Sequence, residues 1–364
     1  MINLPKKEGQ TPSQHWSRAV MSLLSYQWKL FDAQYRTGLG LMESVLAPPP
    51  GGIRPGAAVK AAPAPVEQPR GLERLPEEKV ASAPVAGGGR EGVAQIENRV
   101  ALVTGAASGI GEAVVRALAK RGARAVVLVD RSDRVLDLAR SVNEAAGRQV
   151  AEARVGDVTS DDFRVGVFDE VVARHGPVHI CVPAAGITRD ALSVKLDKAT
   201  GKAMVYPARI FREVTEVNLI APVYWALEMV ARVAEDRARR GLGRWDPKEE
   251  VQGTVVLIGS VSSQGNKGQV AYAAAKAGLD GAAATVMKEA IYHGVRCAII
   301  HPGYTDTPMV RGLGEEYIAR NILPYTQLRR LIRPQEIADA ICFLISNSAV
   351  SGELWADAGW HPSA

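Results

Sequence analysis

The sequence contains few cysteines, and their spacing indicates neither a disulfide framework nor a metal site. Cys181, Cys297 and Cys342 each lie in apolar surroundings, and no two of them form a CxxC pair. Such isolated cysteines are typical of small buried side chains in a reducing compartment. The 6 histidines show no metal-ligand spacing either, so we expect no bound metal.

Long apolar runs and dense blocks of charge are also missing. No apolar run reaches the roughly 18 residues needed to cross a bilayer, and the N-terminus has no signal-peptide core. The formal net charge of +5 is mild, and the basic residues are scattered without the alternation with aromatics that suits nucleic acid. We therefore expect a cytoplasmic protein with no transmembrane segment and no nucleic-acid partner.

The sequence divides into three regions that differ in composition and in the spacing of apolar residues. Residues 1–46 include an amphipathic helical segment, because apolar and aromatic side chains recur at helical spacing over residues 12–46. Residues 47–95 are rich in Pro, Ala and Gly, which predicts a linker that cannot bury enough apolar surface to fold alone. Residues 96–364 then form the main domain.

The main domain alternates short β-branched runs with helical stretches. Near-continuous apolar runs are typical of strands buried in a parallel sheet. The alternation predicts an α/β domain with a doubly wound parallel sheet, the Rossmann fold. The strand candidates are "RVALVTG", "AVVLVD", "HICVPAAG", "TVVLIGS", "VRCAII" and "ELWADAG".

A glycine-rich loop follows the first of these strands. In "TGAASGIG" the three glycines Gly105, Gly109 and Gly111 allow a tight turn and a close approach to a ligand. The helix that follows presents free N–H groups to a pyrophosphate, so the context predicts dinucleotide binding. The second strand ends at Asp130, whose carboxylate suits adenosine ribose hydroxyls and would repel a 2′-phosphate. A strand-ending turn residue is the alternative role for Asp130.

The stretch "AYAAAKAGLDG" carries Tyr272 and Lys276 four residues apart. On a helix this spacing places both side chains on one face. A nearby ammonium favours the phenolate and is expected to lower the tyrosine pKa, which suits a residue that gives and takes a proton. On the pair alone, a surface lysine beside a packed tyrosine is the simpler interpretation.

Further motifs in a fixed order extend this pattern. The chain from about Ile96 to Pro362 resembles the short-chain dehydrogenase/reductase family, and within it the 3-oxoacyl-[acyl-carrier-protein] reductases and acetoacetyl-CoA reductases. The motifs that carry the resemblance are "TGAASGIG", "GDV", "AAGITRD", "VNLIAP", "IGSVSSQGNKGQVAYAAAKAG", "HPGYTDTPM" and "RPQEIADAICFLIS".

The resemblance implies four catalytic residues. Tyr272 would be the general acid and base, Lys276 would lower its pKa and bind the nicotinamide ribose, Ser260 would orient the carbonyl, and Asn218 would hold a water for proton supply. The residues implied in cofactor binding are Gly105, Ser108, Gly109, Ile110, Gly111, Asp130, Asp157, Val158, Ala185, Gly186, Tyr272, Lys276, Pro302, Gly303, Thr305 and Thr307.

The sequence also departs from the family pattern. Ser260 lies one residue closer to Tyr272 than is usual, which leaves Ser262 and Ser263 as alternatives. The usual NNAG reads "PAAG", and the final GG reads "AG". Two extra stretches, about Lys198 to Arg209 and about Asp236 to Glu250, are most simply surface loops.

These observations predict an NAD(P)-dependent oxidoreductase that interconverts a ketone and a secondary alcohol, with a 3-oxoacyl/3-hydroxyacyl thioester favoured. Alternatives are a cyclic, aromatic or steroid alcohol, or a granule- or partner-binding protein whose N-terminal helix is the main functional part. Ser108 and Asp130 favour NAD over NADP. We expect a homo-oligomer, a tetramer by family resemblance, formed through the helices that begin near Phe211 and Ala271. For residues 12–46 the alternatives are docking onto this oligomer and binding to an apolar surface or another protein.

Overall fold

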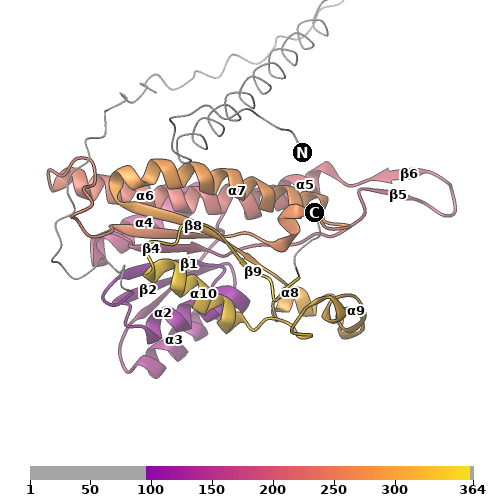
Figure 1. Cartoon of the computed structure of the whole chain (residues 1–364), viewed down its shortest axis with the longest axis horizontal. Coiled ribbons are helices and arrows are strands. Elements are labelled where there is room, and N and C mark those ends of the chain that lie inside the picture. The colour runs from indigo at the N-terminus through magenta and orange to yellow at the C-terminus, as the bar shows by residue number, and fades with distance from the viewer. Residues whose placement is uncertain (1–95, 361–364) are drawn as a thin grey trace, which may run out of the picture. The chain divides into compact units, whose positions relative to one another are not determined.

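The computed structural model describes residues 96–360. The predicted N-terminal helical segment and linker lie outside these residues. The described residues form a central parallel sheet with helices on both of its faces (Figure 1). This arrangement confirms the predicted doubly wound α/β fold.

The sheet has 7 strands in the order β3-β2-β1-β4-β7-β8-β9. Every neighbouring pair in it is parallel. The chain builds outward from β1 to β3, then returns to the other side of β1 and builds outward to β9. The direction therefore changes between β1 and β4, which is where ligands bind in sheets of this kind. The strands are β1 (Val100–Thr104), β2 (Ala125–Asp130), β3 (Ala151–Val155), β4 (Ile180–Pro183), β7 (Gly253–Ile258), β8 (Val295–Pro302) and β9 (Gly352–Ala356).

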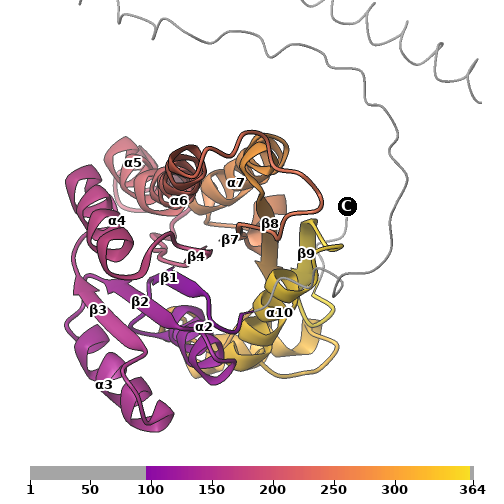
Figure 2. The ribbon, with the colours of Figure 1, turned by 90° about the vertical axis from the view of Figure 1, so that its left-hand side faces the viewer.

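Two apolar cores lie on the two faces of the sheet, because alternate residues of each buried strand point to opposite faces. Ala101 and Val103 of β1 face one core, together with α2, α3 and α10. Val100 and Leu102 face the other, together with α4, α6 and α7. Figure 2 shows the two groups of helices on opposite sides of the sheet. The helices are α2 (Gly109–Lys120), α3 (Arg134–Ala146), α4 (Asp161–His175), α5 (Ala208–Thr215), the π-helix η1 (Glu216–Ile220), α6 (Ala221–Arg239), η2 (Val261–Gln264), α7 (Val270–Ala290), η3 (Ile291–His293), α8 (Pro308–Arg311), α9 (Glu315–Asn321), η4 (Leu323–Tyr325) and α10 (Pro334–Ser346).

One helical stretch in the described part, Ala208–Arg239, is long and apolar enough by composition to cross a membrane. Its apolar side chains are used inside the domain. Trp225 and Met229 have no solvent exposure and pack in the core beneath α6. The Trp225 indole N–H also donates to the Val158 carbonyl at 2.9 Å. This stretch is therefore a core helix of the α/β domain.

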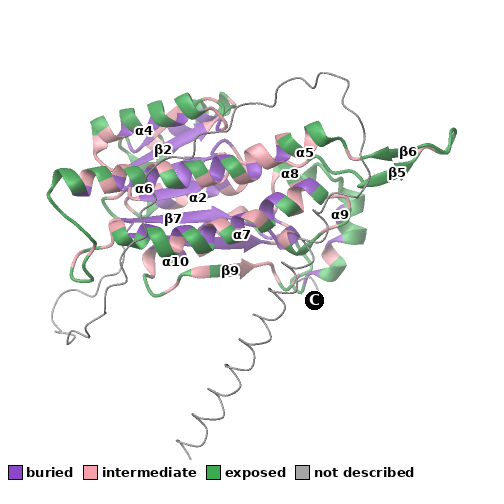
Figure 3. Ribbon diagram, turned by 90° about the horizontal axis from the view of Figure 1, so that it is seen from above, coloured by how far each residue is buried: buried purple, intermediate pink, exposed green. Residues whose placement is uncertain are grey.

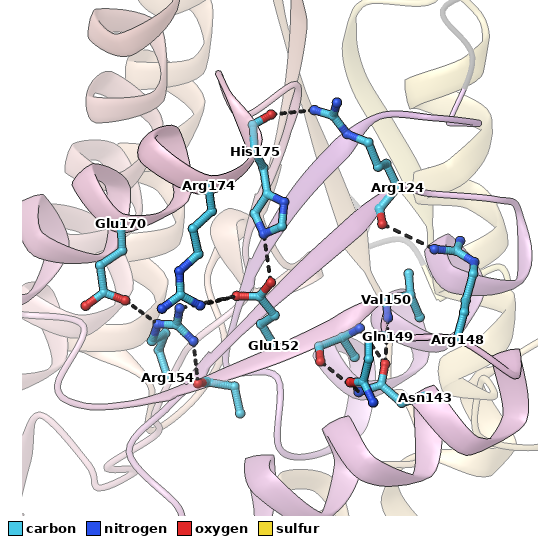
Figure 4. A network of polar contacts seen from close by, with 12 residues as sticks. Arg124, Asn143, Arg148, Gln149, Val150, Glu152, Arg154, Glu170, Arg174 and His175 are labelled. Carbon is cyan, nitrogen blue, oxygen red and sulfur yellow. Dashed lines mark hydrogen bonds and ion pairs between the residues drawn. The ribbon is translucent and has the colours of Figure 1, made fainter.

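Strand β3 was absent from our strand candidates. In its sequence, AEARV, charged side chains alternate with apolar ones. This alternation fits an edge strand, which pairs only with β2. Polar contacts hold it instead (Figure 4). Glu152 contacts the His175 ring at 2.7 Å, and Arg154 contacts Glu170 at 2.9 Å. Burial opposes ionisation of Glu152, but the hydrogen bond to His175 and neighbouring arginines lower its pKa overall.

The first extra stretch corrects our expectation of a surface loop. It forms the turn and the second strand, β6 (Ala203–Val205), of an antiparallel hairpin whose first strand is β5 (Val194–Leu196), with Val194 opposite Val205. The alternation in "VKL" and "AMV" matches strand periodicity, and the Asp197 carboxylate accepts the backbone N–H of Thr200 at 2.8 Å in the turn. The hairpin projects from the same end of the domain as α8 and α9, and it is exposed along its length (Figures 1 and 3).

The second extra stretch is anchored to the domain. Its first residues continue α6 to Arg239. The buried Arg237 then makes an ion pair with Glu249 at 2.6 Å, and the backbone N–H of Trp245 donates to the Tyr292 carbonyl at 2.8 Å. This segment is therefore a helical extension and a tied loop.

Candidate active site

The glycine loop after β1 is packed against two later segments of the chain. Gly105 has a φ of +64°, and a Cβ added there would lie 2.6 Å from the Ala185 backbone. A Cβ on Gly109, which has a φ of +59°, would lie 2.9 Å from the Thr307 methyl carbon. Only glycine fits these positions without strain. The structure thus brings together three motifs that are far apart in sequence.

The start of α2 fits the pyrophosphate of a dinucleotide. Ser108 is the N-cap residue, and its side chain makes no capping hydrogen bond. The first N–H groups of the helix are therefore not capped by this side chain, and the helix dipole favours an anion beside them. Beside it opens a hollow of about 250 Å³, lined by Ser108, Gly109, Glu112, Ala113, Arg116, Arg134, Asp306, Pro308, Pro334 and Gln335.

Asp130 lies at the end of β2 and is held in place by backbone amides. One carboxylate oxygen accepts the N–H of Ala107 at 3.0 Å, and the other accepts the N–H of Ser132 at 2.9 Å. The residue therefore closes the turn after β2 and also supports the glycine loop. The turn role that we considered from sequence is present, and the carboxylate lies beside the loop as the cofactor role requires.

The remaining predicted cofactor residues follow the carboxyl ends of β3, β4 and β8. Asp157 is exposed and accepts the N–H of Thr159 at 2.9 Å, while Val158 is buried. After β8, the Thr305 hydroxyl donates to the Gly303 carbonyl at 3.0 Å, and Thr307 caps α8. Because the strands are parallel, these positions share one edge of the sheet.

Tyr272 lies in the first turn of α7, where the Ser260 side chain is close enough to lower its pKa. Among the three candidate serines, Ser262 instead directs its hydroxyl to Gln269 at 2.8 Å, and the buried Ser263 hydroxyl has no partner. Ser260 also accepts the N–H of Ser262 at 3.0 Å, which orients its side chain at the end of β7. The structure therefore brings Ser260, and not its neighbours, to Tyr272.

Lys276 is buried one turn further along α7. Its ammonium donates to the Ile258 carbonyl at 2.7 Å and lies 5.7 Å from the centre of the Tyr272 ring. Burial lowers the pKa of Lys276 to about 8, against the opposing charge of Asp280. Burial also raises the pKa of Tyr272 to about 12, although the hydrogen bond from Ser260 opposes the change. This direction is opposite to the lowered tyrosine pKa that we expected from the sequence, because burial is the largest effect on Tyr272.

Asn218 lies in the π-helix η1, which interrupts the helical stretch between α5 and α6. Its side-chain oxygen accepts the N–H of Ile187 at 3.1 Å. Its amide nitrogen donates to the carbonyls of Ile187 at 2.9 Å and Val214 at 2.8 Å. A π-bulge often marks a functional position in a helix. Here it lets Asn218 fix the segment after β4.

Sequence reasoning missed two polar residues behind this group. His301, the last residue before the "PG" of the β8 motif, has no solvent exposure. Its Nδ1 lies 3.3 Å from both the N and the O of Ser260. Asp280 lies 3.6 Å from His301 Nε2 and follows Lys276 by one helical turn. The only signal in the sequence was the (i, i+4) spacing of Lys276 and Asp280.

Comparisons with known proteins agree with this geometry. A family model described as enoyl-(acyl carrier protein) reductase matches residues 105–361. The 3-oxoacyl-[acyl-carrier-protein] reductase FabG of Escherichia coli (strain K12) is 31% identical over 260 residues, which cover 71% of this chain and 94% of that protein. The acetoacetyl-CoA reductase of Allochromatium vinosum is 31% identical over 253 residues, with 69% and 92% covered.

One further relative and one solved structure are also similar to this chain. The cis-4-hydroxycyclohexanecarboxylate dehydrogenase of Sinomonas cyclohexanicum is 32% identical over 267 residues, which cover 72% of this chain and 96% of that protein. A short-chain type dehydrogenase/reductase from Mycobacterium marinum has the same fold, with a TM-score of 0.63 and 23% identity over 74% of this chain and 98% of that one.

The fold and these matches define the class of protein. The chain belongs to the short-chain dehydrogenase/reductase family. It is an oxidoreductase that acts on the CH–OH group of its substrate with NAD(P).

Proposed function

We propose that this enzyme interconverts a 3-oxoacyl and a 3-hydroxyacyl thioester, with NAD(H) as its cofactor. The observation that carries the proposed chemistry is the grouping of Tyr272 with the Lys276 ammonium, which lies 5.7 Å from the tyrosine ring, and with Ser260 after β7. The thioester class is supported by the names of two relatives, a 3-oxoacyl-[acyl-carrier-protein] reductase and an acetoacetyl-CoA reductase.

The proposed roles follow from the charge states of the buried groups. When bound, the nicotinamide supplies a hydride to the carbonyl carbon in reduction and accepts it in oxidation. Tyr272 is a neutral phenol at physiological pH, because its pKa is about 12, so it donates its proton to the carbonyl oxygen. The Ser260 hydroxyl binds the same oxygen as its negative charge develops. Lys276 stabilises the tyrosinate that is left until solvent returns the proton.

We further propose that NAD(H) is preferred over NADP(H). The Asp130 carboxylate is fixed beside the glycine loop by two backbone amides, so it cannot readily turn away from a ligand. A fixed carboxylate there accepts hydrogen bonds from ribose hydroxyls and repels a 2′-phosphate. The neighbouring Arg131 is exposed and reduces this discrimination.

A second candidate substrate is a cyclic secondary alcohol. The dehydrogenase of cis-4-hydroxycyclohexanecarboxylate is as similar to this chain as the thioester reductases are, at 32% identity. The reaction at the carbinol carbon is the same, so the proposed catalytic group serves either substrate.

A spectrophotometric screen distinguishes the candidates. Purified protein is assayed at 340 nm with NADH and with NADPH against acetoacetyl-CoA, longer 3-oxoacyl thioesters, a cyclic ketone and a simple ketone. We expect the highest kcat/KM with NADH and a 3-oxoacyl thioester. Turnover confined to the cyclic ketone would replace the thioester by the second candidate.

We also propose that the catalytic domain forms a homo-oligomer, a tetramer as is common in the family, through the surface of α5 and α7. Ala274 and Ala277 are exposed on α7, and such small side chains allow two helices to approach closely. Gly278, which we had expected on the same surface, instead packs against Leu219 within the chain. Light scattering at micromolar concentration is expected to give several times the chain mass of 38.9 kDa. A monomer would contradict the proposal.

A further inference from the structure

A cluster of ionisable side chains lies behind the proposed catalytic group. Asp280 belongs to α7, His301 to β8 and Glu353 to β9. His301 is fully buried and stacks on the Trp355 ring, with the ring centres 4.2 Å apart. Its Nε2 lies 3.6 Å from an Asp280 carboxylate oxygen and 3.9 Å from a Glu353 carboxylate oxygen. Three elements of the domain thus meet at one imidazole.

Two atoms of this cluster lack hydrogen-bond partners. His301 Nε2 and the facing Asp280 oxygen are both buried and unpaired among the described residues, although only 3.6 Å separates them. A buried polar atom without a hydrogen-bond partner costs free energy. Two such atoms that face each other therefore indicate either a functional role for the contact or local strain. A small shift would turn the contact into an imidazole–carboxylate hydrogen bond.

The opposite edge of the imidazole faces the proposed catalytic serine. His301 Nδ1 lies 3.3 Å from the backbone N and O of Ser260. If Nδ1 accepts the Ser260 N–H, the neutral ring carries its proton on Nε2, directed at Asp280. This tautomer pairs Nδ1 with the serine amide and points the Nε2 proton toward Asp280, since the partner of one nitrogen determines the protonation of the other.

Asp280 also lies beside Lys276. The two residues are four apart on α7, so they share a helix face. A buried ammonium is costly unless a negative charge is near it. The ionised Asp280 is the negative group on that face, and its charge opposes the lowering of the Lys276 pKa by burial.

We propose that Asp280 and His301 are positioning residues for this active site. Asp280 keeps Lys276 protonated and holds the His301 ring, and His301 in turn holds the backbone of Ser260. The proposal rests on the proposed function of Ser260, Tyr272 and Lys276. It assigns to Asp280 and His301 the support of Lys276 and Ser260, the two residues grouped with Tyr272.

The charges around Asp280 determine the sign of the expected pH effect. Lys276 faces it from α7, His301 from β8, and Glu353, half-exposed, from β9. Burial raises the pKa of Asp280, and the neighbouring Glu353 carboxylate adds to the rise, whereas the facing His301 ring and the Lys276 ammonium oppose it. Removing the Asp280 charge removes the interaction that opposes burial of Lys276, so Lys276 would lose its proton at a lower pH.

The test compares Asp280→Asn with Glu289→Gln. Glu289 is exposed near the end of the same helix, so its substitution removes one negative charge that lies further along the helix from Lys276 than Asp280 does. For each variant, kcat/KM is measured from pH 6 to 10 with NADH and the best ketone of the screen. We expect the alkaline decline of the wild type near pH 8 to move down by about one pH unit in Asp280→Asn only. Profiles that coincide, or an equal shift in Glu289→Gln, would overturn the proposal.

A second measurement does not depend on any substrate. Nitrogen-15 NMR of the histidine rings in the wild type is expected to show His301, identified by its loss in His301→Asn, as a neutral ring protonated at Nε2. In Asp280→Asn this preference is expected to weaken. A wild-type ring protonated at Nδ1 would refute the assigned geometry. Because this readout needs no turnover, it distinguishes failure of the positioning proposal from failure of the proposed reaction.

Discussion

At the scale of single residues, burial acts in opposite directions on the two proposed proton-handling groups. It raises the pKa of Tyr272 to about 12 and lowers that of Lys276 to about 8. At physiological pH the phenol of Tyr272 is therefore neutral. The neighbouring Lys276 is protonated, but its pKa lies close to that pH. A neutral phenol is the form that reduction requires, because it has a proton to give.

Substitutions separate the two roles. Tyr272→Phe removes the transferable proton but leaves the ring, so we expect turnover to fall by about a hundredfold or more while the Kd for NADH changes little. Lys276→Met is expected to impair both, because Lys276 is also assigned a contact with the nicotinamide ribose. Steady-state kinetics and fluorescence titration with NADH measure the two effects. A Tyr272→Phe enzyme with more than about a tenth of the wild-type rate would contradict the assignment.

Asp130→Ala tests the proposed cofactor preference. The substitution removes a fixed negative charge, so the ratio of kcat/KM for NADH over NADPH is expected to fall by about tenfold, or roughly 1.4 kcal/mol. It also removes an acceptor for the Ala107 N–H, and some loss with both cofactors is therefore expected. Equal kcat/KM values for the two cofactors in the wild type would refute the role given to Asp130.

Which residues could be predicted from the sequence depends on how locally their roles are determined. The (i, i+4) spacing of Tyr272 and Lys276 and the glycines after β1 carry their geometry within a short segment, so both were predictable. The choice of Ser260 over Ser262 depends on a turn that η2 creates, and sequence left it open. The contacts of His301 depend on three separate elements meeting, which no short pattern encodes.

At the scale of elements, the β5–β6 hairpin is an unusual feature of the domain. The residues of one of its faces, Val194, Leu196 and Val205, are exposed by 58%, 64% and 74%. Its base is tied to the body by the Tyr206 hydroxyl, which donates to the Arg189 carbonyl at 2.7 Å. The contacts that hold the hairpin are therefore few and local.

Removing the hairpin is expected to leave the fold intact. In the variant, residues 193–206 are replaced by a short Gly-Ser turn. We expect its melting temperature to lie within about 4 °C of the wild type, because a loss of about 1 kcal/mol in the free energy of unfolding shifts the melting temperature by about this much in a domain of 150–250 residues. Circular dichroism and thermal melts measure it. An insoluble or molten product would show that the hairpin is part of the folding core.

Most strands were predictable from sequence because they are fully buried, and the partly exposed edge strand β9 was predicted as well. The strands with near-continuous apolar runs were found, because a sheet covered on both faces demands them. Strand β3 and the hairpin escaped, since one lies at an edge held by ion pairs and the other is exposed. In both cases polar residues interrupt the run, and pairing with a neighbouring strand decides the structure.

At the scale of the whole molecule, residues 96–360 contain the complete sheet, both apolar cores and all the proposed catalytic residues. Deletion of residues 1–90 is therefore expected to leave a soluble protein with wild-type kcat, while changing its distribution between the fractions of a cell lysate. Activity assays and fractionation test the two parts. An inactive or insoluble truncation would place part of residues 1–90 in the catalytic fold.

The order of the elements along the chain, with β9 after the catalytic residues, has a consequence for biosynthesis. Strand β9 pairs only with β8, and its Glu353 and Trp355 contact His301 behind the catalytic group. On the ribosome, Tyr272 and Lys276 are therefore synthesised long before the strand that completes their surroundings. A nascent chain that stops before Gly352 would expose the edge of β8, which is a template for aggregation. Translation must thus pass β9 before the enzyme can acquire a supported active site.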